Sequence, residues 1–80
     1  MTGVIQMLPV IDTEATALRI DQLRLENNLS VRDIQKAFGF SSPQAVYGWL
    51  RAKSIPSIDN LVGLASLLHT SIDNLIVTMQ

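Results

Sequence analysis

The 80-residue chain has no cysteine, one histidine and few charged side chains, and each scarcity excludes a class of protein. Without cysteine, disulfide bridges and thiolate metal sites are excluded, and a reducing compartment is expected. The single histidine, His69, lies near the end of a predicted helix and has no second ligand at metal-binding spacing. The carboxylates fall at helix starts or on exposed faces, which leaves no acid/base pair. We therefore expect no enzyme, no metal and no cofactor.

Long apolar runs are missing as well. No run reaches the roughly 18 residues that a membrane-spanning helix requires. The apolar residues 4–11 are interrupted by Gln6 and Pro9 and lack the basic start of a signal peptide. The four glycines form no phosphate-binding loop. We expect a cytoplasmic protein with no membrane contact and no small-molecule ligand.

The composition favours one small domain. Hydrophobic residues make up 48% of the chain, which is ample for a core, whereas charged residues make up only 16%. So few charges on so small a protein indicate that some apolar surface is covered by another molecule, most simply by a second copy in a dimer.

Helix signals divide residues 13–80 into five helices and predict a compact all-α domain. Ser30, with Asp33 three residues later, forms an acidic version of the capping box. Asn28 and Gly39 tolerate the left-handed backbone that commonly ends a helix. The expected caps at the five helix starts are Asp12 or Thr13, Ser30, Ser42, Ser57 and Ser71.

Apolar side chains recur at helical spacing and define the predicted core. Trp49, the only tryptophan, falls on an inward position and is assigned to the core. The predicted inward residues are Ala17, Ile20 and Leu23; Val31, Ile34, Ala37 and Phe38; Val46, Trp49 and Leu50; Leu61, Leu64, Ala65 and Leu68; and Ile72, Leu75 and Ile76.

Residues 1–12 form an apolar arm outside this domain. Gly3 and Pro9 disfavour a helix there, so we expect an extended backbone. The arm either covers the core of its own subunit or crosses to a partner subunit, and the sequence leaves both alternatives open. Together with the apolar C-terminal residues 76–79, it is the expected dimer contact.

The charged residues are distributed unevenly along the chain. Residues 30–53 carry four basic side chains and one acidic side chain, a balance of +3, whereas residues 1–29 and 54–80 each have a balance of −2. A positive patch on a negative chain indicates a site for an anionic partner. Because two short predicted helices joined by a tight turn lie within this segment, the partner it indicates is DNA.

The third predicted helix, which starts after Pro43, offers a face for reading base pairs in the major groove. Gln44 in its first turn can form two hydrogen bonds with adenine, and Tyr47 can contact a thymine methyl group or a phosphate. Gly48 weakens the helix by about 1 kcal/mol relative to alanine and would permit close approach to the groove wall. The candidate phosphate contacts are Arg32, Ser41, Ser42, Arg51 and Lys53.

Each of these residues also has an explanation without DNA. A glutamine such as Gln44 on an exposed helix face is solvated polar surface in most proteins. Ser42 needs no ligand if it caps a helix. The DNA-binding hypothesis therefore depends on the combination of charge, turn and helix spacing.

Several motifs spread over residues 13–77 resemble those of one family. They are Ile20-x-x-Leu23-Arg24; Leu29-Ser30-Val31-Arg32-Asp33-Ile34-Gln35; Phe38-Gly39-Phe40-Ser41-Ser42-Pro43-Gln44-Ala45-Val46-Tyr47-x-Trp49-Leu50-Arg51; Pro56-Ser57-Ile58-Asp59-Asn60-Leu61; Leu64-Ala65; Leu67-Leu68; and Ser71-Ile72-Asp73-Asn74-Leu75. The chain resembles the Cro/lambda-repressor-like (xenobiotic-response-element type) helix-turn-helix regulators.

The resemblance implies a compact five-helix fold in which the second and third helices read DNA. It also implies a bacterial or phage transcriptional regulator, commonly dimeric on a near-palindromic operator. Base-reading positions carry over to Ser42, Pro43, Gln44, Ala45, Tyr47 and Gly48, and backbone-contacting positions to Arg32, Arg51 and Lys53.

Three departures from the family pattern concern the contacts rather than the fold. Leu50 occupies the place of a glutamate that pairs, in many relatives, with an arginine at the position of Arg24, so Arg24 needs another partner. Val31 replaces a frequent glutamine, which removes one phosphate donor. The turn from Gly39 to Ser42 is one residue longer than usual, which shifts the register of the base contacts.

Taken together, these features predict a sequence-specific, repressor-like DNA-binding regulator that acts as a homodimer. The alternative is a protein-interaction module, such as an antirepressor or antitoxin-like subunit, that keeps the fold without strong DNA binding. The net charge of −1 and the scarcity of lysine favour this alternative.

Overall fold

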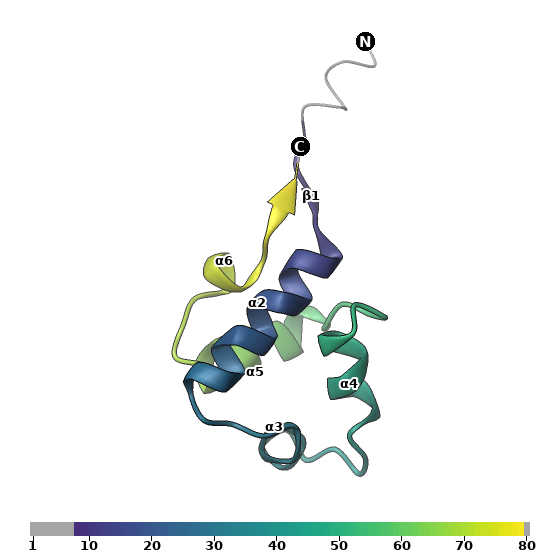
Figure 1. The fold of residues 1–80 in the computed structure, drawn as a ribbon, viewed down its shortest axis with the longest axis vertical. Coiled ribbons are helices and arrows are strands. Elements are labelled where there is room, and N and C mark those ends of the chain that lie inside the picture. Colours follow the sequence, from purple (N-terminus) through teal and green to yellow (C-terminus); the bar gives the residue numbers. More distant parts are fainter. Residues whose placement is uncertain (1–7, 80) are drawn as a thin grey trace.

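Five helices and two short strands make up residues 8–79, the part of the chain that the computed structural model describes (Figure 1). In chain order they are β1 (Val10–Ile11), α2 (Thr13–Glu26), α3 (Val31–Phe38), α4 (Gln44–Leu50), α5 (Ile58–Leu67), α6 (Ile72–Leu75) and β2 (Thr78–Met79). The predicted compact five-helix architecture is confirmed. β2 was not predicted from the sequence, because a strand of two residues has too little pattern to detect.

Side-chain caps determine where the first two helices begin. Asp12, and not Thr13, caps α2, because its carboxylate accepts the N–H of Ala15 at 3.0 Å. At the start of α3 the Ser30 hydroxyl accepts the N–H of Asp33 at 3.0 Å, and the Asp33 carboxylate accepts the N–H of Ser30 at 2.8 Å. The predicted capping box is therefore present with both of its hydrogen bonds.

The remaining caps and helix ends also follow local rules. Ser57 and Ser71 cap α5 and α6 as predicted, each accepting a backbone N–H three residues later at 3.2 Å. Asn28 after α2 and Gly39 after α3 have φ angles of 57° and 71°, in the left-handed region that turns the chain out of a helix.

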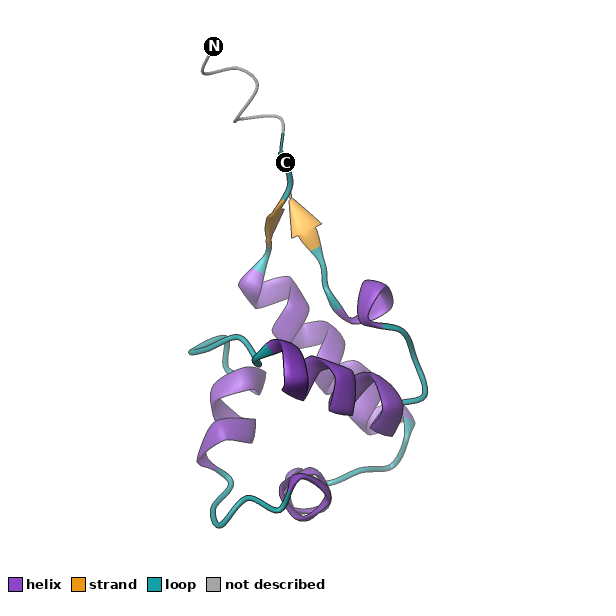
Figure 2. Cartoon of the chain, turned by 180° about the vertical axis from the view of Figure 1, so that it is seen from behind, coloured by secondary structure: helices purple, strands orange, loops and turns teal. Residues whose placement is uncertain are grey.

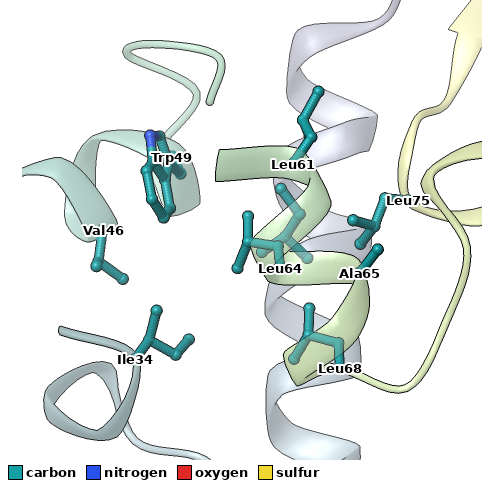
Figure 3. Packing of buried hydrophobic residues seen from close by; sticks show 9 residues of the cluster. Ile34, Val46, Trp49, Leu61, Leu64, Ala65, Leu68 and Leu75 are labelled. Atoms are coloured by element: carbon teal, nitrogen blue, oxygen red, sulfur yellow. The ribbon is translucent and has the colours of Figure 1, made fainter. Parts of the chain in front are cut away.

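Side chains from all five helices form one core. In Figure 3, Ile34 from α3 and Val46 and Trp49 from α4 lie on one side of this core, and the leucines of α5 lie on the other. Burial of each large side chain contributes about 1.5–3 kcal/mol. The buried cluster consists of Ile20, Ile34, Val46, Trp49, Leu61, Leu64, Ala65, Leu68 and Leu75, all predicted to face inward.

One predicted inward position is wrong, because Ala37 is exposed. The neighbouring Phe38 reaches α5 in its place: a Cβ atom added at Gly63 would lie only 2.7 Å from the Phe38 ring. The ring fills the space between α3 and α5, and a methyl group is too short to reach across it. Ala37 instead lies at a surface hollow that Phe38 and Gly63 also line.

β1 and β2 pair antiparallel and form a two-stranded ribbon (Figures 1 and 2). Val10 lies opposite Met79, and Ile11 lies opposite Thr78. The ribbon extends beyond the N-terminal end of α2, away from the core. It therefore brings together the two chain segments that the sequence analysis assigned to a dimer contact.

The arm does not cover the core of its own subunit where the structure describes it. Leu8, Val10 and Ile11 are exposed, because the backbone before α2 runs toward β2 instead of over the helices. That alternative is wrong for residues 8–11, and residues 1–7 lie outside the described part of the chain. The contact with a partner subunit stays a prediction.

A buried threonine anchors the ribbon to α2. Thr16 is 3% exposed, and its hydroxyl accepts the N–H of Val77 at 3.0 Å and donates to the Val77 carbonyl at 3.3 Å. The N–H of Asp12 donates to the same carbonyl at 2.8 Å. Thr16 was not among the predicted inward residues. Its place beside Ala17 on the inner face of α2 is the one feature of the sequence that indicates its burial.

The capping box of α3 makes the stability of the fold depend on pH. Hydrogen bonds from the backbone N–H and the hydroxyl of Ser30 hold the pKa of Asp33 below its ordinary value of 3.8. Because folding lowers this pKa, Asp33 stabilises the fold fully above pH 3.8, and this contribution is lost as the pH falls through the lowered value.

We expect the Asp33→Ala variant to have a lower Tm than the wild-type protein at neutral pH, since the carboxylate that accepts the N–H of Ser30 is lost while the backbone N–H of residue 33 still donates to the Ser30 hydroxyl. The difference in Tm should shrink as the pH is lowered below the ordinary carboxyl range of about 4. Thermal unfolding followed by circular dichroism at several pH values measures this difference. Asp59→Ala, which removes an exposed first-turn carboxylate without a box, is the control. An equal difference in Tm for Asp33→Ala at all pH values would contradict the role of the charged carboxylate.

Candidate nucleic-acid interface

Three aromatic rings fix the turn between α3 and α4. Phe38 and Phe40 stack with their ring centroids 5.4 Å apart, and both lie edge-on to Trp49 at 5.6 and 5.8 Å. Aromatic pairs in these geometries contribute about 0.5–1.5 kcal/mol beyond their burial. Since Trp49 belongs to α4, the cluster holds the turn and both helices as one unit, residues 31–50, which we call the helix pair.

α4 begins one residue later than predicted. Pro43 occupies the cap position, with φ of −83° and ψ of 4°, and its carbonyl accepts the N–H of Tyr47 at 3.0 Å. The prediction that Ser42 caps this helix is therefore wrong, and its hydroxyl only approaches the N–H of Gln44, at 3.5 Å. The reason is that the first intrahelical hydrogen bond begins at the Pro43 carbonyl, which places Ser42 one residue before the cap position.

α4 has an inner and an outer face. Val46 and Trp49 are buried in the core, while Gln44 and Tyr47 on the opposite side are exposed. The packing of the inner residues against the other helices therefore determines how the outer face is presented to a partner.

Five residues predicted as DNA contacts line one hollow of about 280 Å³ on the outer face: Gln44, Tyr47, Gly48, Arg51 and Lys53. Within this hollow the Arg51 guanidinium lies over the Tyr47 ring, 4.7 Å from its centroid. This cation–π contact restricts the tyrosine ring at the rim of the hollow. The structure thus brings polar, aromatic and basic groups together on the helix that the sequence assigned to base reading.

Gly48 lies against the turn that follows α4. Its carbonyl accepts the N–H groups of Lys53 and Ser54, at 2.9 and 3.3 Å, and a Cβ atom at position 48 would lie 3.0 Å from the Ser54 hydroxyl oxygen. This close approach gives the glycine a role within the protein, in addition to the groove contact expected from the sequence. The contact of Ser54 with Gly48 was not predicted, because no local sequence pattern shows that the turn after α4 folds back onto the helix.

The basic side chains near this face have no acidic partner. Arg32, Arg51 and Lys53 are exposed, and none of them forms an ion pair within residues 8–79. Positive side chains without a carboxylate partner remain available to an anion such as a DNA phosphate.

The other predicted contacts lie outside the hollow. Ser41 and Ser42 are exposed in the turn, Ala45 is exposed in the first turn of α4, and Pro43 is half-buried. Arg32 is exposed in the first turn of α3. The structure leaves these side chains accessible but does not gather them into one site.

Arg24 is paired within the protein, although Leu50 occupies the place of the glutamate that would pair with it in many relatives. Its guanidinium donates two hydrogen bonds to the Asp21 carboxylate, at 2.7 and 3.0 Å, and one to the Leu29 carbonyl, at 3.0 Å. Leu50 packs against the core. Arg24 therefore connects the end of α2 to the approach to α3. Asp21 was predictable as its partner, since residues three apart are neighbours on a helix.

The sequence matches the model of the helix-turn-helix family over residues 20–75, from the middle of α2 to the end of α6. The chain belongs to the Cro/C1-type helix-turn-helix family. Members of this family are DNA-binding regulators, and the helix pair of α3 and α4 is the helix-turn-helix unit of this one. No curated protein and no solved structure gives a significant match.

No cluster of three potential metal-ligating side chains occurs within residues 8–79, and none of the described helices is both long and apolar enough to cross a membrane.

We expect Arg24→Ala to lower the free energy of unfolding by about 1–2 kcal/mol, since it removes a charge-assisted hydrogen bond and leaves the Leu29 carbonyl without its donor. Urea denaturation at neutral pH measures this loss. Arg32→Ala, which removes an exposed arginine without an ion pair, should stay within about 0.5 kcal/mol of the wild-type value. Equal stability of the two variants would show that the Arg24 bonds contribute nothing to the fold.

Proposed function

We propose that this protein is a sequence-specific, repressor-like regulator that places α4 in the major groove of DNA. The supporting observation is the outer face of α4, where Gln44, Tyr47 and Gly48 share a hollow with two basic residues that have no acidic partner. A groove about 12 Å wide admits one helix, and it is this face that would meet the base edges.

In this proposal the first turn of α4 supplies the base contacts. Gln44 forms two hydrogen bonds with an adenine, and Tyr47 packs against a thymine methyl group beside it. The neighbouring residues Ser42, Pro43 and Ala45 contribute closer packing against the groove. Gly48 leaves room for the groove wall as well as for the turn after α4.

Phosphate contacts would position the helix along the duplex. Arg51 and Lys53 lie at the hollow, and Arg32 and Ser41 extend the contact toward the start of α3 and the turn. Such contacts add affinity for any sequence, because they need only charge and hydrogen-bond donors.

We further propose that the protein acts as a homodimer on a near-palindromic operator in the cytoplasm. A balance of +3 over residues 30–53 is modest for holding a duplex, so a second copy doubles the number of phosphate contacts. Two α4 helices about 34 Å apart would enter successive major grooves on one side of the DNA.

Gln44→Ala is expected to relax base preference at one operator position, losing about 1–3 kcal/mol of discrimination. Lys53→Ala should weaken specific and random DNA alike and reduce the slope of affinity against salt by about one. Lys53 is a better test of a phosphate contact than Arg51, because Arg51 also contacts Tyr47. Binding titrations on an operator series and on random DNA measure both effects. Equal losses on specific and random DNA for Gln44→Ala would refute its base-reading role.

The alternative function is a protein-interaction module that has kept the fold. The net charge of −1 and the close approach of Ser54 to Gly48, which gives the glycine a neighbour within the protein, favour it. Selection of bound genomic fragments at about 50 mM salt decides between the two, since a DNA-binding protein that neutralises several phosphates binds most tightly at low salt. We expect an enriched sequence whose affinity falls steeply with salt. No enrichment and no detectable binding would support the protein-interaction module.

A further inference from the structure

The ribbon of β1 and β2 concentrates exposed apolar side chains. Leu8, Val10 and Met79 are 61%, 57% and 52% exposed, and Ile11 is 37% exposed. No charged side chain interrupts this surface, because residues 1–11 and 74–80 contain no Asp, Glu, Lys or Arg. An uncharged apolar surface of this kind on a small domain indicates a contact with another molecule.

The backbone of the ribbon presents one regular free edge. Asp12 donates its N–H inward to the Val77 carbonyl. Because the backbone groups of successive strand residues point to opposite sides, those of Thr78 point outward on β2 and those of Ile11 outward on β1. On β1 the preceding outward position is Pro9, which has no N–H to offer. On β2 the preceding outward position, Ile76, donates its N–H to the Ile72 carbonyl, so within residues 8–79 Thr78 supplies the N–H and carbonyl of this edge. Since no proline ring obstructs it, β2 is the edge that can accept another strand.

The edge of β2 carries no lysine or proline, the side chains that most often keep an edge strand from pairing. Its shortness is the one protective feature present, and it limits the pairing to the two residues Thr78 and Met79. A two-stranded ribbon is also marginally stable by itself, whereas a sheet with more strands and one apolar face is not. The ribbon therefore becomes more stable when further strands join it at β2.

We propose that the free edge of β2 is the dimer interface of this protein, and that its occupant is the β2 strand of a second copy. The two β2 strands run antiparallel about a two-fold axis between the two Thr78 residues, which exchange their N–H and carbonyl groups. Four strands then form one sheet. Val10 and Met79 lie opposite each other and share a face of the ribbon. The two Val10 and two Met79 side chains of the dimer therefore line one face of that sheet.

A second copy suits this edge better than an unrelated partner, because the edge is complementary to itself. Antiparallel pairing about a two-fold axis places the same residues in contact from both sides, as closed dimers require. The hydrogen bonds between Thr16 and Val77 fix the base of the ribbon on α2. The dimer that results would therefore hold its two α4 helices at a fixed spacing.

This inference rests on the proposed homodimer, but it can be tested without DNA. Sedimentation equilibrium of the full chain measures the dimer dissociation constant. Thr78→Pro removes the outward N–H and leaves the hydrogen bond between Asp12 and Val77 in place, while Met79→Lys puts like charges on the shared face. Each variant is expected to raise the dissociation constant on the order of tenfold or more. Circular dichroism verifies that both variants keep their helices.

Two matched variants provide the controls. Leu18 on α2 and Ile58 on α5 are 71% and 77% exposed and lie outside the ribbon, so Leu18→Lys and Ile58→Lys should leave the dissociation constant unchanged. A wild-type protein that sediments as a monomer at about 1 mM, well above the range of stable dimers, would overturn the inference. So would a dimer that Ile58→Lys or Leu18→Lys dissociates while folded Thr78→Pro and Met79→Lys do not.

DNA binding separates this inference from the proposed function. If the edge of β2 forms the dimer, Met79→Lys should bind a single half-site as the wild-type protein does and lose affinity on the full operator only. A wild-type dimer that both β2 variants dissociate, but that binds no DNA, would refute the proposed function and support the interface. Half-site and full-operator affinities that stay unchanged in a monomeric variant would refute the link between interface and operator.

Discussion

The packing of one short helix against the core is the constraint on which the site depends. α4 has seven residues, far fewer than the roughly 12–15 that an isolated helix needs in water. Its position is therefore maintained by Val46 and Trp49, buried on its inner face, and by the two phenylalanine rings that meet Trp49 edge-on. The outer face is presented correctly only while this inner face stays buried.

The basic residues divide into those that serve the fold and those that remain available. Arg24 is held by Asp21 and Leu29, and Arg19 donates a hydrogen bond to Asn74 at 3.2 Å. Both lie on α2, outside the helix pair. None of the arginines and lysines of residues 30–53 forms an ion pair within residues 8–79, so the charge contrast in the sequence corresponds to a real difference in availability.

Features governed by neighbours in the chain were predictable, and features governed by distant neighbours were not. The periodicity of the apolar residues identified every member of the buried cluster, and the capping box at Ser30 follows from four consecutive residues. Ala37 and Ser42 were misassigned, since their surroundings depend on the Phe38 ring against α5 and on the backbone of Pro43. At the candidate site the residue types and their shared helix face were predictable. The close approach of Ser54 to Gly48 was not, because the path of the turn after α4 has no pattern in the sequence.

The hydrogen bonds between Thr16 and Val77 also affect how the chain folds, since they join residues 61 positions apart. The helices depend mainly on local contacts, which form quickly, whereas closing so long a loop is slow. During synthesis the first helix emerges long before the residue that satisfies its buried hydroxyl. The beginning of α2 is therefore completed only when the last part of the domain has left the ribosome. The hydrogen bonds of Thr16 with Val77 are therefore among the last interactions of the domain to form.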